Sequence, residues 1–370
     1  MKKLLSALLV ILLVFSLCGC ITIEIRSSKT SEDQSSASGA ESQTSAAESR
    51  AESSEPVAES SVPEETSTEE PTDESSGEPV ETDGISPLLW RVSDGSGHSI
   101  YLFGTIHIGD ERTYAAIGQV EKYIDECDAV AVEFDVIAYS NDMEANIRDL
   151  QQFIYTDGTT IRDHISPELV DRVVALLNGV GEYNPVYERM NAAIWSELVD
   201  DVLLMTKTDL ESDYGVDMNI LDKCHTEGKE ILELESASLQ YGVMNAFGDS
   251  FYEYMINSSL DSAEFYGETC ETMYTAWLEG DADTLLEFIG DGAAGGYDES
   301  VPAEEIDEYN YKMGTERNLG MFKKARAWLD SGKKVFVTAG EAHMIAADGL
   351  VSLFEDAGYK VEKIATEVKN

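Results

Sequence analysis

The alternation of apolar and polar stretches divides the chain into three parts. Residues 4–17 are almost purely apolar and follow two lysines, a pattern typical of an export signal and too short for a comfortable membrane span. In residues 21–86, aliphatic clusters give way to Ser, Glu, Thr, Ala and Pro. Such a stretch buries too little apolar surface to offset its conformational entropy, so we predict a disordered acidic tether. Short apolar runs and helical spacings fill residues 87–370, which we predict to form one folded domain.

The front of this domain predicts strands and a helix in alternation. Apolar runs at residues 87–92 and 99–103 flank a glycine-rich turn, which is typical of a hairpin. Residues 114–127 have the apolar spacing of a helix. Residues 128–135 form a short apolar run that ends in acidic side chains, as expected of a buried parallel strand whose carboxyl end carries the polar groups.

The rest of the chain predicts a helical middle and a second alternation of strands and helices. Residues 139–329 are mainly helical, with one helix that ends at Gly228 and a short strand at residues 230–235. The helix expected at residues 319–329 turns four apolar side chains inward: Leu319, Phe322, Ala325 and Leu329. The elements expected after it are a strand, a helix and a strand, at residues 333–339, 345–357 and 359–364. The predicted fold is therefore α/β, a mixed, mainly parallel sheet with helices on both faces and a large helical insertion.

The end of the leader predicts a lipid anchor. In bacterial lipoprotein signals a small residue directly precedes the modified cysteine, so Gly19 before Cys20 fits and Leu17 before Cys18 does not. We therefore predict a signal peptide over residues 1–20, lipidation at Cys20, and a location on the extracytoplasmic face of the cell membrane. The alternative is an ordinary cleaved signal with incidental cysteines.

Charge and cysteine content narrow the class of protein. The chain has 72 acidic and 25 basic residues, a formal net charge of −47, and the domain stays strongly acidic without its tether. This excludes nucleic acid as a partner and electrostatic docking on anionic lipid. A solvated acidic surface accounts for the charge, with a cation or a basic substrate as the functional alternative. Cys127, Cys224 and Cys270 form no CxxC pair, so we expect small core residues.

Two strand ends repeat one local design, a glycine followed three residues later by a histidine. Gly104 precedes His107 in this way, and Gly340 precedes His343. In open α/β sheets, ligands gather at the carboxyl ends of the strands, and glycine lets the backbone pass close to them. Either histidine alone would be a hydrogen-bonded structural residue, whereas the pair favours a site. His98 also follows a glycine at this spacing, but it lies in a turn, where we expect it to be solvated.

Glu133 supplies a third candidate group. It lies in an apolar run, where an unpaired carboxylate is costly to bury, so it belongs to a site or pairs with Arg317 or a lysine. Two neutral imidazoles and a carboxylate suit Zn, Mn, Co or Fe(II). If His107, Glu133 and His343 serve one ion, their donor atoms converge to about 3–4 Å of one another. His164 and His225 lack this strand-end context, and we expect surface or core residues.

Several ordered segments resemble the TraB/GumN family, whose animal relatives are the TIKI metalloproteases that act on Wnt proteins. The resemblance rests on residues 89–91, 101–107, 128–135, 215–217, 234–235, 240, 316–318, 321, 340–344 and 358–359. It implies a fold like that of the erythromycin esterases and the ChaN-like haem-binding lipoproteins.

The resemblance also implies site residues. It makes the paired histidines and Glu133 the catalytic and metal-linked groups, with Arg317 and Asn318 in the same centre. Glu341 stands where many members have a small residue, and His225 where alanine is common. Glu341 is therefore an extra ligand or a solvated side chain, and the general base is Glu133 or Glu341.

Residues and resemblance together predict an extracytoplasmic metal-dependent hydrolase, above all a peptidase, using Mn, Co or Zn. His107, His343 and Glu133 would hold the ion or its water, and Arg317 would steady the oxyanion. No HExxH motif is present, which excludes an ordinary zincin. The expected partners are a peptide or protein substrate and, through the lipid anchor, the membrane. The alternative is a non-catalytic binding lipoprotein for a peptide pheromone or haem.

Overall fold

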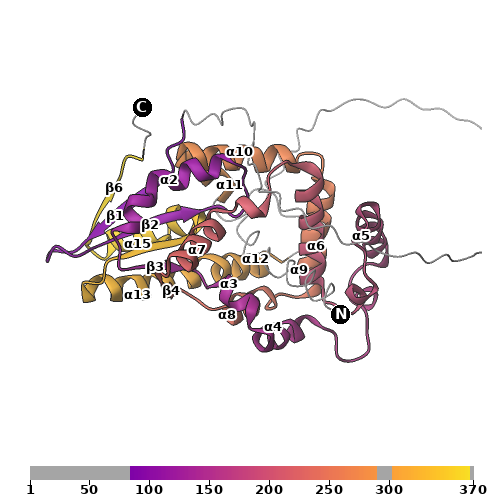
Figure 1. The fold of residues 1–370 in the computed structure, drawn as a ribbon. Helices are drawn as coiled ribbons and strands as arrows, with labels where there is room; N and C mark the ends of the chain where they lie inside the picture. The colour runs from indigo at the N-terminus through magenta and orange to yellow at the C-terminus, as the bar shows by residue number, and fades with distance from the viewer. Residues whose placement is uncertain (1–83, 290–301, 367–370) are drawn as a thin grey trace, which may run out of the picture. The chain divides into compact units, whose positions relative to one another are not determined.

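The computed structural model describes residues 84–289 and 302–366. The predicted signal peptide, Cys20 and nearly all of the tether lie outside the described residues. A six-stranded sheet has the strand order β4-β3-β5-β2-β1-β6 (Figure 1). Its strands are β1 (Leu89–Ser93), β2 (Ser99–Thr105), β3 (Ala129–Val132), β4 (Glu230–Glu233), β5 (Val335–Gly340) and β6 (Lys360–Lys363).

The pairing of the strands brings the front and the back of the chain into one sheet. β4, β3, β5 and β2 are mutually parallel, and β1 pairs antiparallel with both β2 and β6. The register of β2 on β5 sets Thr105 opposite Gly340. This confirms the α/β prediction and the hairpin. Because β2, β3 and β5 are parallel neighbours, their carboxyl ends lie at one edge of the sheet.

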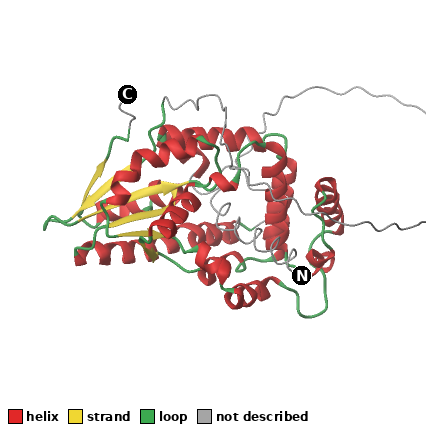
Figure 2. Cartoon of the chain, in the orientation of Figure 1, coloured by secondary structure: helices red, strands yellow, loops and turns green. Residues whose placement is uncertain are grey.

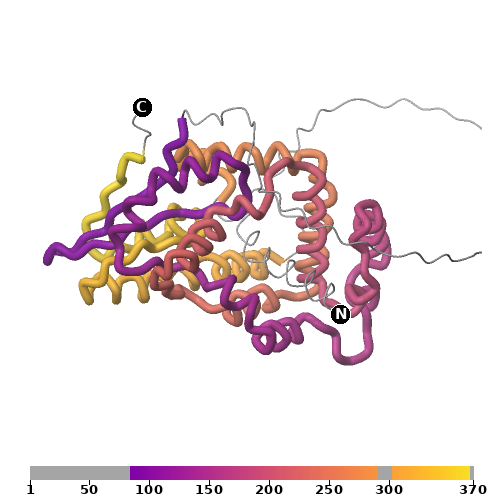
Figure 3. The backbone as a smooth tube through the Cα atoms, viewed as in Figure 1, coloured from indigo at the N-terminus to yellow at the C-terminus, as the bar shows by residue number. Residues whose placement is uncertain are grey.

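Helices cover both faces of the sheet and form the insertion (Figure 2). The first are α2 (Arg112–Asp125), α3 (Val136–Asn141), α4 (Met143–Leu150), α5 (Pro167–Val180), α6 (Ala192–Lys207), α7 (Val216–Glu227) and α8 (Ala237–Met244). The others are α9 (Asp249–Asp261), α10 (Tyr266–Glu279), α11 (Ala282–Ile289), α12 (Ala303–Asn310), α13 (Glu316–Ser331), α14 (Glu341–Ile345) and α15 (Leu350–Asp356). Helices α5, α6 and α9 of the insertion are labelled in Figure 1, and they lie to the right of the sheet in the same view in Figure 3.

Two predictions about the back of the chain are corrected. The helix expected at residues 345–357 begins only at Leu350, as α15, and a separate short helix, α14, precedes it. The backbone turns between them at Gly349, where a side chain would collide with the carbonyl oxygens of Met344 and Ala346. Leu319, expected to face inward, is 48% exposed. The buried face of α13 instead begins with Arg317 and Asn318, so polar groups occupy the face that an apolar pattern assigns to leucine.

The core is apolar and contains the three cysteines of the domain. Trp195, Trp277, Tyr241 and Tyr274 are among its largest fully buried side chains. The cysteines at positions 127, 224 and 270 are buried and unbridged, which confirms them as core residues. Within the described ranges, no helix has the length and apolar character needed to span a bilayer.

Helix α6 carries a buried acid that makes stability depend on pH. Glu197 is 8% exposed, and its Oε2 has no hydrogen-bond partner among the described residues. Burial, with the nearby carboxylates of Asp200 and Asp201, raises the pKa of Glu197 well above its ordinary value. The folded chain therefore keeps a proton that the unfolded chain releases above about pH 4. Stability is lost as pH rises above that point, by up to about 1.4 kcal/mol per pH unit from this group.

Replacing Glu197 with glutamine removes this proton uptake. We expect the Glu197→Gln variant to be more stable than the wild type by a margin that grows from pH 5 to pH 7. Urea unfolding at several pH values measures the margin, with the exposed Glu279 replaced by glutamine as the control. A margin that does not change with pH would contradict this interpretation of Glu197.

Candidate active site

Three side chains from distant parts of the sequence converge beside Gly340, at the end of β5. His107 follows β2, Glu133 directly follows β3, and His343 lies in α14 directly after β5. A methyl group placed at Gly340 would lie 3.6 Å from Glu133 Oε1 and 3.8 Å from both His107 Nε2 and His343 Cδ2. Atoms that each lie this close to one point are at most about twice that distance apart. The carboxyl edge of the sheet therefore brings together all three predicted residues.

Glu133 is held by three hydrogen bonds. Its Oε1 accepts from the backbone N–H of Gly340 at 2.8 Å, and its Oε2 accepts from Arg317 Nη2 and Gln240 Nε2, both at 2.7 Å. Burial alone would raise the pKa of Glu133, but the positive charge of Arg317 outweighs burial and lowers this pKa well below the ordinary value. Glu133 is thus an ionised carboxylate at neutral pH. The sequence offered a site and an ion pair with Arg317 as alternatives for Glu133. In the structure, Glu133 pairs with Arg317 and also lies close to the two histidines.

Arg317 lies between two carboxylates. Besides Glu133, its guanidinium donates to Glu235, with Nε 3.1 Å from each carboxylate oxygen and Nη2 2.9 Å from Oε2. Gln240 Nε2 also donates to Glu235 Oε2, at 3.0 Å. Exposed fractions of these side chains are 7% for Arg317, 12% for Glu133 and 3% for Glu235. The group is therefore buried with one more negative than positive charge.

His107 is oriented by Asp217, in the first turn of α7. Its Nδ1 lies 2.8 Å from Asp217 Oδ1, which directs Nε2 toward Gly340. The helix approaches so closely that a side chain at Gly215 would collide with the carbonyl oxygen of His107. Burial disfavours the charged imidazole, but the Asp217 carboxylate outweighs it, so the pKa of His107 is raised.

Removing the charge of Asp217 tests this orientation. In an Asp217→Asn variant we expect the pKa of His107 to fall, because the carboxylate that favours the imidazolium is gone. Proton NMR titration of the imidazole signals measures it, with the His107 signal assigned from its absence in His107→Asn. An unchanged titration of His107 would show that Asp217 does not govern this ring.

His343 is held by Asn318 in the neutral form. Its Nδ1 lies 2.6 Å from Asn318 Oδ1, while Asn318 Nδ2 lies 3.5 Å from Asp348 Oδ1. Thr315, which precedes α13, bonds to the same aspartate. Since the amide N–H of Asn318 faces Asp348, its oxygen accepts from His343 Nδ1–H, which makes Nε2 the nitrogen with the lone pair. Burial and the charge of Arg317 lower the pKa of His343 to about 3.

The environments of the two histidines therefore push their pKa values apart. His107 is favoured as the cation by Asp217, and His343 stays neutral beside Arg317. An ionised carboxylate, Glu133, lies beside the same glycine as both rings. Groups separated in this way supply the acid and base functions that proton transfer needs.

Glu341 does not join this group. A side chain at Gly104 would collide with the Glu341 carboxyl, and successive positions of paired strands face opposite sides of the sheet. Gly104 pairs with Ala339, so Glu341 lies on the face opposite to Glu133, next to Trp277. Glu341 is only 7% exposed, so the expectation of a solvated side chain is wrong. Neither of its oxygens accepts a hydrogen bond within the described residues, and burial raises its pKa to about 8.

The two imidazoles and the carboxylate are side chains of the types that bind a divalent ion. Their arrangement matches such a site only in part. Nδ1 of each imidazole has a fixing partner, which leaves Nε2 as the ligating nitrogen, as in carboxylate–histidine–metal units. In residues 84–289 and 302–366, no group of three His, Cys, Asp or Glu side chains is arranged to hold an ion. The oxygens of Glu133 are engaged by Arg317, Gln240 and Gly340 instead.

The other histidines lie apart from this centre. His164 Nδ1 and His225 Nε2 each lie 2.9 Å from an aspartate, Asp249 and Asp135 respectively. Both side chains are partly exposed, and His98 lies in the turn between β1 and β2. This confirms that the three belong to no strand-end group.

Sequence reasoning gave no role to several residues that hold the centre. Asp217, Glu235 and Gln240 entered only as parts of segments, and Asp348 and Thr315 did not enter. One local signal was available for Glu235, a carboxylate two residues after the short strand β4. Asp217 follows a glycine at the start of a helix, a position that also suits an ordinary first-turn acid.

An open, mainly parallel α/β sheet with histidines, a carboxylate and an arginine at its carboxyl edge defines a protein with a candidate catalytic site at that edge. The chain belongs to the TraB/PrgY/gumN family, whose model matches residues 88–363. Comparison with curated proteins gives no match, and neither does comparison with solved structures.

Proposed function

We propose that the protein is a metal-dependent hydrolase, above all a peptidase, that acts on a peptide or protein substrate outside the cell membrane. The observation that supports this best is the convergence of His107 Nε2, Glu133 Oε1 and the ring of His343 around Gly340. One fold hosts many reactions, so the proposal rests on these side chains more than on the family.

The proposed ion is Mn, Co or Zn, with His107, Glu133 and His343 as its ligands. When bound, such an ion polarises a substrate carbonyl and lowers the pKa of water. Glu133 would exchange one of its present hydrogen bonds, to Arg317 or to the Gly340 N–H, for this role.

The protein's own groups would then handle protons and charge. Glu133 is ionised and lines the same pocket as His107, and its carboxylate accepts the proton of the attacking water. Glu133 is favoured over Glu341 as the base, because Glu341 lies on the opposite face. Arg317, held in place by its ion pair with Glu235, donates to the oxygen on which negative charge develops.

A peptide-library digest with the full chain tests this function. We expect fragments in the presence of Mn, Co or Zn, their loss with a chelator, and recovery when one of these ions is restored. Absence of cleavage with all three ions would overturn the hydrolase proposal. Peptide or haem binding without turnover would support the alternative, a binding lipoprotein.

The proposed location on the membrane rests on Cys20. A Cys20→Ala variant is expected to stay as unprocessed precursor or to leave the membrane fraction, because the acceptor thiol is lost. Cys18→Ala is the matched control and should be processed normally, since Leu17 does not fit the position before a modified cysteine. Detergent phase partitioning and gel mobility measure both effects. Equal processing and partitioning of the two variants would contradict the proposal that Cys20 carries a lipid anchor.

A further inference from the structure

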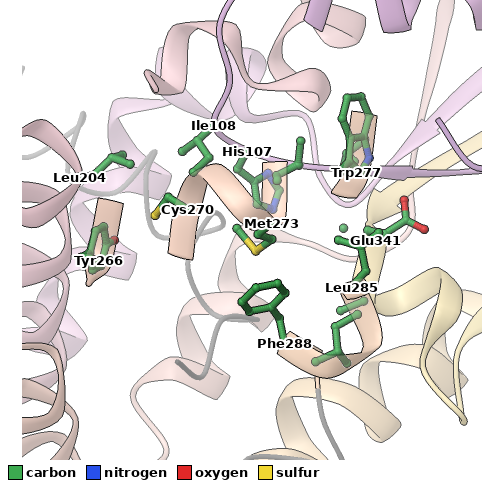
Figure 4. Close-up of a pocket in the computed structure, with 15 residues that line it drawn as sticks. His107, Ile108, Leu204, Tyr266, Cys270, Met273, Trp277, Leu285, Phe288 and Glu341 are labelled. Carbon is green, nitrogen blue, oxygen red and sulfur yellow. The ribbon is translucent and has the colours of Figure 1, made fainter. Parts of the chain in front are cut away.

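A second pocket lies on the other side of the end of β2. It encloses about 720 Å³ of space, part of it open to solvent. Figure 4 shows its walls, which come mainly from α10 and α11. The apolar side chains that define it include Ile108, Cys270, Met273, Trp277, Leu285 and Phe288.

This pocket borders the candidate active site. Thr105 and His107 line it and also line the smaller pocket that contains Glu133 and Asp217. Gly340, around which the three site residues converge, borders it as well. A group that fills the apolar pocket therefore has one end against His107.

The chemistry of the walls selects an uncharged occupant. Among the described residues that line the pocket there is no lysine or arginine, and the one carboxyl, Glu341, points away from Met273 and Phe288 in Figure 4. Both carboxyl oxygens of Glu341 are buried, so neither is accessible to a ligand in the pocket. Transfer of apolar surface from water into such a site is favourable.

We propose that this pocket binds a large apolar side chain of the substrate, next to the bond that the His107 centre attacks. Along an extended peptide, a carbonyl and its neighbouring side chain lie a few ångströms apart. The pocket that contains Glu133 and the apolar pocket lie on either side of His107, in a matching arrangement. Peptides with Phe, Leu or Met at that position are therefore the preferred substrates. The inference rests on the proposed function and names its substrate class.

Displacement of a fluorescent probe from the full chain tests the pocket without any cleavage. The neutral probe N-phenyl-1-naphthylamine is displaced by two blocked pentapeptides of glycine, one with a central Phe and one with a central Ala. We expect the Phe peptide to displace it at a concentration at least about 10-fold lower, the scale on which apolar pockets discriminate. Equal displacement by the two peptides, or no probe binding, would overturn the proposal.

Two variants on α11 locate the effect. Phe288 lines the pocket, whereas Leu286 is 37% exposed and does not line it. Phe288→Ala should reduce the Phe-over-Ala preference several-fold, and Leu286→Ala should keep it. Loss of the preference in both variants or in neither would contradict the assignment. If Phe-selective binding persists but no peptide is cleaved, the proposed hydrolase activity fails while the apolar site stands.

Discussion

Replacing Arg317 with methionine is expected to destabilise the protein by about 3–5 kcal/mol, as measured by urea unfolding at pH 7. Arg317 pairs with two buried carboxylates at once, Glu133 at 2.7 Å and Glu235 at 2.9 Å. Methionine fills similar space but leaves both carboxylates buried without a counter-charge. The loss should shrink at low pH, where Glu133 is protonated and needs no cation.

Two further variants separate charge from packing. Arg326→Met is on the same helix, at a side chain 51% exposed and paired with Asp330 at 3.5 Å, and should leave the unfolding midpoint nearly unchanged. Adding Glu235→Gln to Arg317→Met should recover part of the lost stability, because one uncompensated charge is removed. Strictly additive losses in the double variant would show that Arg317 acts by packing alone.

The largest expected effect on activity comes from the two histidines. His107→Asn and His343→Gln should each lower the rate of peptide cleavage by roughly 10²–10⁴-fold, the usual contribution of a group that takes part in proton transfer. The double variant should lose little more than either single variant, because residues that act as one unit are not additive. Independent, multiplying losses would place the two histidines in separate steps or separate sites.

His225→Asn is the matched control for these losses. His225 is 36% exposed, pairs with Asp135 and lies outside the converging group. Cleavage by this variant should equal that of the wild type. A comparable loss would mean that histidine replacement impairs the protein in general.

The inner strands β2, β3 and β5 were predictable because they are short apolar runs bounded by local signals. Glycine is one such signal. Helix α7 ends at Gly228, which adopts a φ of +68°, a conformation that few other residues take. The errors arose where the buried face is polar. On α13 the inward positions carry Arg317 and Asn318, so apolar spacing assigned the wrong face to Leu319.

The centre was predictable as far as strand ends reveal it. His107, Glu133 and His343 each follow a strand, which locates them at one edge once the strands are parallel. The pairs that hold them, such as His107 with Asp217, depend on how distant helices pack, and no local spacing encodes that. The face on which Glu341 lies depends on strand register, which the sequence pattern leaves open.

Metal content of the full chain is the most direct test of a single centre formed by His107, Glu133 and His343. The chain is incubated with Mn, Co or Zn, freed of unbound ion by gel filtration, and analysed by mass spectrometry of the metal. We expect about one ion per chain in the wild type and in His225→Asn, and loss of the ion in both His107→Asn and His343→Gln. Metal content that is the same in the two histidine variants as in the wild type, or cleavage by a wild type that holds no metal, would contradict the shared site.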